Sequence, residues 1–109
     1  GELLMEIFKQ KIIKFCTENK IFELAKNCSS KKHDYTEKEI LALSDWNHIK
    51  NYLCDLNSDL FAIFRSKYGR MRHKGDDGLN AIVSPINYEL SSLIDYITNL
   101  TVNNYEELS

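Results

Sequence analysis

The sequence has little proline and little glycine, and it lacks any long run of apolar residues. One proline and four glycines in 109 residues leave few natural breaks, so long irregular segments are not expected. Its uncharged apolar runs are only a few residues long, too short to cross a bilayer, so we expect no membrane partner. A composition of 43% hydrophobic and 28% charged residues is that of an ordinary folded domain.

The cysteines and histidines form neither a disulfide framework nor a metal-binding pattern. Cys16, Cys28 and Cys54 are odd in number and far apart, with no C-x-x-C pair among them. We therefore expect reduced thiols in an intracellular protein, cytoplasmic or nuclear, with most of the thiols acting as small buried apolar groups. The histidines supply no H-x-x-x-H pair, so no zinc site is predicted.

Sequence motifs for catalysis and cofactor binding are missing as well. The chain has no glycine-rich phosphate loop of the P-loop or dinucleotide-binding kind. Asp76 and Asp77 stand between two glycines, but the later glutamate of a calcium loop is absent, so a turn is expected there. These absences indicate a non-enzymatic piece that needs no cofactor and no metal.

Apolar residues recur at helical spacing over most of the chain. Leu4, Phe8, Ile12 and Phe15 predict a helix over about 3–17, and the capping box of Thr36 and Glu39 predicts another helix start. Further helices are predicted over 21–25, 46–56, 60–68 and 86–100, with loops over 27–34 and 70–78. The sequence thus predicts an all-α fold, a compact four- to five-helix bundle or an orthogonal helical array.

Three of these boundaries depend on local signals. A cap that separates two helices is predicted at Asn57-Ser58-Asp59, and the end of the second helix is predicted at Gly69. Ser84-Pro85 reads as the start of the last helix.

The chain is expected to be one domain, residues 1–109, excised from a longer protein. Gly1 stands where an initiator methionine would be, and the first residues lack the basic flank and cleavage site of a signal peptide. A length of 109 residues suffices for a single core.

The strongest anomaly in the sequence is a basic segment over 65–74. It holds all three arginines of the chain and two lysines but no acid, although the chain as a whole carries a net charge of −2. Arginine and lysine side chains there could contact phosphates, and Tyr68 could stack on an unpaired base. Alternatively, these side chains are only solvated charges at a helix end, where positive charge interacts favourably with the helix dipole. The candidate binding residues, for phosphate or for a partner, are Arg65, Lys67, Tyr68, Arg70, Arg72, His73 and Lys74.

A basic stretch that ends in histidine between two helices resembles the active-site region of the HEPN ribonucleases. That family's motif sets an arginine a few residues before the histidine. Here Arg65 lies farther from His73, and Arg70 lies nearer, than the motif requires. No catalytic role is therefore carried over to these residues, and an RNase-like fragment is the least favoured interpretation.

The aromatic residues suggest a recognition surface. Most of them must fill the core, but Tyr52, Tyr88, Tyr96 and Tyr105 stand near polar positions and could contact a partner. We therefore predict a non-catalytic helical interaction domain that docks a partner protein. The alternative is RNA or DNA binding through the basic segment.

Overall fold

The computed structural model describes residues 2–69 and 75–103, and over these residues the chain is helical and contains no strand. The described helices are α1 (Glu2–Glu18), α2 (Ile21–Ala25), α3 (Glu37–Leu41), α4 (Trp46–Tyr68) and α5 (Gly75–Asn103). The predicted all-α class is therefore confirmed.

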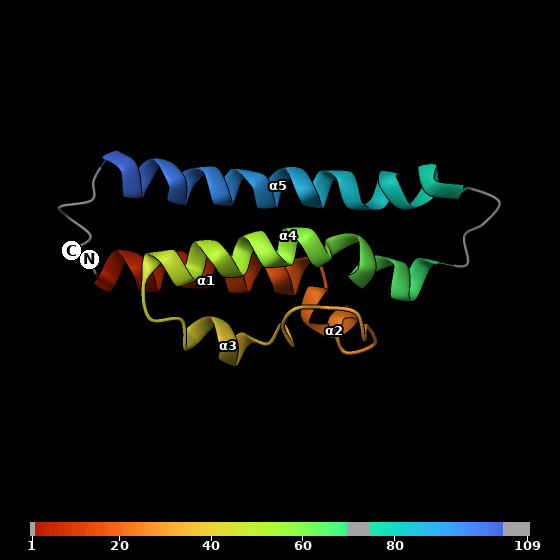
Figure 1. Cartoon of the computed structure of the whole chain (residues 1–109), viewed down its shortest axis with the longest axis horizontal. Coiled ribbons are helices and arrows are strands. Elements are labelled where there is room, and N and C mark those ends of the chain that lie inside the picture. The colour runs from red at the N-terminus through yellow and green to blue at the C-terminus, as the bar shows by residue number, and fades with distance from the viewer. Residues whose placement is uncertain (1, 70–74, 104–109) are drawn as a thin grey trace.

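The three long helices lie along the long axis of an elongated molecule that measures 52 × 24 × 20 Å. In Figure 1, α1 and α4 run in the same direction, and α5 returns beside them in the opposite direction. The short helices α2 and α3 lie on the other side of α1 and α4 from α5 (Figure 1). None of the described helices has both the length and the hydropathy needed to cross a membrane.

The core is built from the apolar stripes that the sequence spacing indicates. Ile12 of α1, Ile49 and Leu56 of α4, and Leu90 and Ile97 of α5 are completely buried. Residues three or four apart lie on one face of a helix, so each long helix offers the core a continuous apolar face.

Local hydrogen bonds explain why the short helices begin and end where they do. The Thr36 hydroxyl accepts from the Glu39 amide at 3.2 Å, and the Glu39 carboxylate accepts from the Thr36 amide at 2.9 Å. This confirms the predicted capping box. At the end of α3, the buried Lys9 ammonium donates to the Leu41 carbonyl at 3.0 Å, which ties α3 to α1.

The predicted break at residues 57–59 is wrong, because α4 continues through it. The three polar side chains find partners that leave the helix intact. Asn57 accepts from the Asn87 side chain of α5, and the Ser58 hydroxyl donates to the Cys54 carbonyl of its own helix. Asp59 accepts from the loop before α3. Burial of the apolar face from Leu53 to Ile63 then stabilises one long helix.

The predicted start of the last helix at Ser84-Pro85 is also wrong, because Pro85 lies inside α5. Residues 75–78, which were expected in a loop, already belong to this helix. Leu79 and Val83 are buried in line with Leu90, so the apolar face extends upstream of the proline. Burial of that face offsets the hydrogen bond that Pro85 cannot donate.

α4 ends at Tyr68, as predicted, but not through a left-handed glycine. Gly69 has a φ of −63°, which any residue can adopt. A Cβ atom at Gly69 would lie 2.7 Å from the Arg65 carbonyl oxygen, so close approach to the preceding turn is what favours glycine here.

Candidate binding surfaces

Three of the residues predicted to form a basic binding site belong to the last turn of α4. Arg65 and Lys67 are exposed, and Tyr68 is half-buried. The Tyr68 ring packs nearly parallel to Phe64, with the Lys67 ammonium 5.4 Å from its centroid. Arg70, Arg72, His73 and Lys74 lie outside the described residues.

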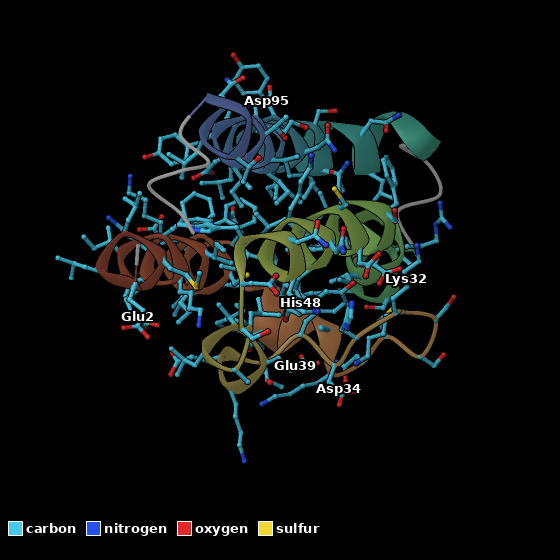
Figure 2. The ribbon with its side chains drawn as sticks, turned by 60° about the vertical axis from the view of Figure 1, so that its left-hand side comes forward. Glu2, Lys32, Asp34, Glu39, His48 and Asp95 are labelled. Atoms are coloured by element: carbon cyan, nitrogen blue, oxygen red, sulfur yellow. The ribbon has the colours of Figure 1, made fainter. Side chains whose placement is uncertain are left out.

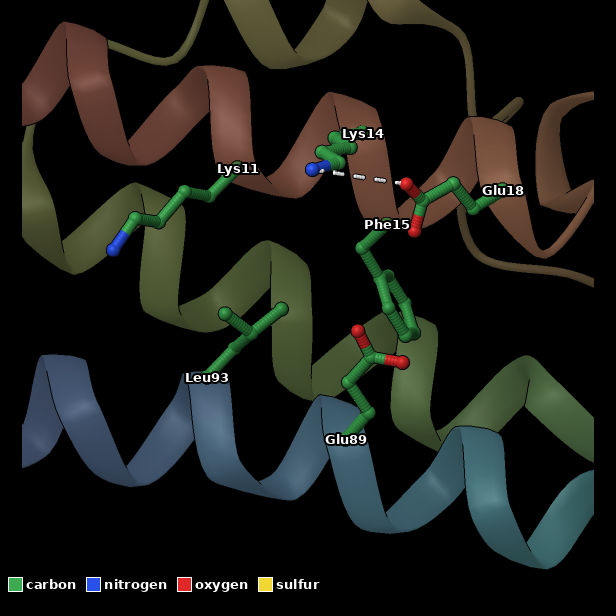
Figure 3. Close-up of a pocket in the computed structure, with 6 residues that line it drawn as sticks. All are labelled: Lys11, Lys14, Phe15, Glu18, Glu89 and Leu93. Carbon is green, nitrogen blue, oxygen red and sulfur yellow. Dashed lines mark ion pairs between the residues drawn. The ribbon is translucent and has the colours of Figure 1, made fainter.

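A groove that sequence reasoning missed runs between α1 and α5. Figure 3 shows its lining side chains, which come from these two helices with α4 behind them, and its volume is about 230 Å³. We call it the α1–α5 groove, and it is lined by Lys11, Lys14, Phe15, Glu18, Glu89 and Leu93.

The two walls of the α1–α5 groove carry opposite charges. Lys11, Lys14 and Glu18 stand on α1, which gives that wall a net positive charge, and Glu89 stands on α5 (Figure 3). Lys14 pairs along its own helix with Glu18 at 3.8 Å, and no ion pair among the described residues crosses the groove.

Stacked aromatic rings pack α1 against α5 near Lys11. Tyr96 of α5 stacks on Phe8 of α1, with ring centroids 5.5 Å apart and planes 8° apart. Lys11 lies 5.6 Å from the Tyr96 centroid, and Phe8 also contacts Trp46 at the start of α4. The indole N–H of Trp46 is buried and has no hydrogen-bond partner among the described residues.

Apolar side chains continue along α1 beyond the α1–α5 groove. Leu3 and Ile7 are 75% and 48% exposed, and with Lys11 they form a row at four-residue spacing. Of the tyrosines predicted to form a surface, Tyr88 and Tyr96 are exposed at 77% and 45%. Tyr105 lies outside the described residues.

The prediction for Tyr52 is wrong, because its ring is buried between α4 and the segment before α3. It lies 5.0 Å from His33 and 5.6 Å from Tyr35, centroid to centroid. Burial, together with the nearby Glu39 carboxylate, raises the pKa of Tyr52 above its ordinary value. The three rings form one small aromatic cluster, and no sequence periodicity could indicate it because loop positions carry none.

The loop before α3 is fastened to α4 through two carboxylates, Asp55 and Asp59, for which the sequence did not predict this role. Asp59 is buried and accepts hydrogen bonds from the Tyr35 hydroxyl and, at 2.7 Å, from the Lys32 amide. One turn earlier, Asp55 contacts His33 Nε2 at 2.7 Å. Figure 2 shows Lys32 at this junction of loop and helix.

These contacts hold Tyr35 buried and with its backbone in the left-handed region. It is 1% exposed, and its backbone has a left-handed φ of 58°, which costs a non-glycine residue roughly 1 kcal/mol. Burial and the hydrogen bond to Asp59 raise the pKa of its hydroxyl. This tyrosine therefore stays neutral and donates to Asp59 throughout the ordinary pH range.

The cysteine predictions can be checked for all three residues. Cys16 and Cys28 are buried, Cys54 is exposed, and all three are free thiols. Burial raises the pKa of Cys16 to about 12, which leaves it an inert apolar group. Among the described residues, no three potential metal ligands come together.

Comparison with known protein families, with curated proteins and with solved structures gives no match for this chain.

Proposed function

We propose that this chain is a non-catalytic docking domain that binds an amphipathic helix of a partner protein in the α1–α5 groove. The observation that carries the proposal is the opposite net charge of the two walls, with Lys11, Lys14 and Glu18 on α1 and Glu89 on α5, and Phe15 and Leu93 between them. A matching helix has an apolar face toward that floor, an acidic flank toward Lys11 and Lys14, and a basic flank toward Glu89.

The surroundings of the α1–α5 groove support a helix as the occupant. Helices pack at interaxial distances of about 8–10 Å, and a ligand helix over α1 and α5 would contact both at once. It would also cover Ile7, which is half-exposed beside the groove. The three free thiols support an intracellular setting for this interaction.

The test uses three designed helical peptides of equal length with the same leucine face. One carries glutamates on one flank and lysines on the other, the second has lysines on both flanks, and the third has glutamates on both. A helix can lie in the groove in either direction, so the mixed peptide always finds one matching orientation. We expect the mixed peptide to bind at least about tenfold more tightly than either of the others, as measured by fluorescence anisotropy.

A charge-reversed variant sharpens the test. Lys11→Glu with Lys14→Glu makes both walls acidic, so preference should pass to the peptide with lysines on both flanks. Lys26→Glu with Lys38→Glu, two exposed lysines outside the groove, is the matched control with the same charge change and should leave the order of affinities unchanged. Equal binding of all three peptides, or a preference that the double variant leaves unaltered, would refute the proposal.

The other occupant to test for is a second copy of the chain. If the groove binds a second copy, light scattering after size exclusion will show a dimer that the Lys11→Glu, Lys14→Glu variant dissociates. That result would replace a partner helix by self-association through the same groove.

Nucleic-acid binding is the second candidate, supported by the exposed Arg65 and Lys67 at the end of α4. It predicts binding of short single-stranded RNA or duplex DNA that weakens steeply with salt and is reduced by Arg70→Glu with Arg72→Glu. An absence of binding even at low salt would leave helix docking alone.

A further inference from the structure

A second hollow, separate from the α1–α5 groove, lies between the loop after α2 and the C-terminal half of α4. Its volume is about 300 Å³, close to the lower bound of small-molecule pockets. The lining residues are Asn27, Cys28, Ser29, Ser30, Ala62, Arg65 and Ser66. We call it the α4–loop hollow.

The lining of the α4–loop hollow is rich in hydrogen-bond donors and contains no carboxylate. Arg65 brings a guanidinium fork, Asn27 a side-chain amide, and Ser29 and Ser30 two hydroxyls. The Ser66 hydroxyl donates to the Ile63 carbonyl at 2.6 Å and so serves its own helix. Such a set of donors suits an oxyanion with several oxygens.

The loop side of the hollow is held in place from several directions. Cys28 is buried at 6% exposure, and its amide donates to the Ala25 carbonyl at 3.1 Å. The Lys31 ammonium donates to that same carbonyl, and the Lys32 amide is fixed on Asp59 of α4. The backbone of Ser29 and Ser30 is therefore bracketed by anchored residues, which lowers the entropy lost when a ligand binds.

We propose that the α4–loop hollow binds a phosphate monoester group, with Arg65 as the charged anchor and Ser29, Ser30 and Asn27 as neutral donors. A monoester carries nearly two negative charges and three free oxygens, and the guanidinium fork can hold two of these oxygens. The hydroxyls and the amide then serve the third oxygen. A phosphodiester, with one charge and two free oxygens, satisfies fewer of these donors.

The test is a nuclear magnetic resonance titration of the whole chain with inorganic phosphate. We expect saturable amide shifts confined to residues 27–30 and 62–66, with a dissociation constant on the order of 1 mM for so open a site. Arg65→Gln should weaken binding about tenfold or more, since a charge-assisted hydrogen bond is lost. Lys50→Gln, a change near the start of the same helix and outside the hollow, should leave it unchanged.

Three further probes identify the kind of ligand. O-phosphoserine and glycerol 3-phosphate should both compete with phosphate for the same amides, and the tighter of the two indicates whether the ligand is a phosphorylated side chain or a small metabolite. Dimethyl phosphate, a diester, should bind at least about threefold more weakly.

The proposal is overturned if phosphate produces no localised shifts, or if Arg65→Gln and Lys50→Gln titrate alike. It is also overturned if dimethyl phosphate binds as well as phosphate. The amide spectrum of each variant without ligand verifies the fold, so a loss of binding is not mistaken for unfolding.

Discussion

Replacing Asp59 should be among the most damaging single changes in this chain. Asp59→Ala leaves two donors without a partner, the Tyr35 hydroxyl and the Lys32 amide, at a site where both aspartate and tyrosine are buried. The orphaned, buried Tyr35 hydroxyl costs roughly 1–3 kcal/mol, and the amide of the exposed Lys32 adds less because water can reach it, so the free energy of unfolding should fall by at least about 1–3 kcal/mol. That is a considerable part of the roughly 5–15 kcal/mol that stabilises a typical domain.

A double-mutant cycle tests this reasoning in chemical denaturation, with the single, buried Trp46 as the fluorescence probe. In Tyr35→Phe the orphaned hydroxyl no longer exists. Adding Asp59→Ala to it should therefore cost about 1–3 kcal/mol less than the same change in the unaltered chain. Asp95→Ala, an exposed carboxylate on the outer side of α5, should change stability by less than about 0.5 kcal/mol (Figure 2). Strict additivity of the two changes would refute the assigned contact.

Three further predictions concern pH, thiols and backbone. Cys16, Tyr35 and Tyr52 have pKa values raised by folding, so the native state keeps protons that the unfolded chain releases. The free energy of unfolding, measured by urea titration, should therefore be level below about pH 9. Above that pH it should fall, first through Cys16 and from about pH 10 also through the tyrosines, by at most ~1.4 kcal/mol per pH unit for each group. Tyr52→Phe should flatten the fall above pH 10, and midpoints that stay level to pH 11 would contradict these assignments. A thiol reagent should label Cys54 at once and Cys16 and Cys28 only on unfolding, so rapid labelling of all three by mass spectrometry would be inconsistent with the burial described. Pro85→Ala should raise the free energy of unfolding by up to about 2 kcal/mol, and with it the melting temperature, because α5 regains a backbone donor, whereas Ser84→Ala beside it should change little.

The helices with strong local signals were predictable from the sequence. α1 and α2 follow from apolar spacing alone, and the capping box of Thr36 and Glu39 fixed the start of α3 to the residue. The errors at Asp59 and Pro85 share one physical cause. Both residues look like helix boundaries when only their neighbours in sequence are considered, but tertiary packing of the apolar faces overrides that local preference.

The candidate sites were less accessible to sequence reasoning. Arg65 was selected as an anion-binding residue, but Ser29 and Ser30, which lie across the hollow from it, read only as loop formers. The α1–α5 groove joins Lys11 with Glu89, and nothing in a single sequence pairs residues so far apart. Exposed charges on amphipathic helices have no periodic signature that separates a binding wall from an ordinary solvated face.

The antiparallel return of α5 along α4 has a kinetic consequence. These two helices are consecutive in the chain, so the contacts nearest their connection close short loops, whereas Phe8 of α1 must find Tyr96 of α5 across most of the sequence. We expect the α4–α5 hairpin to form early and α1 to dock late. Pulsed hydrogen exchange would show this as earlier protection of α4 amides, and earlier protection of α1 would exclude it. On that order of events the α1–α5 groove is completed only in the last folding step, so a helical ligand would slow unfolding without accelerating folding.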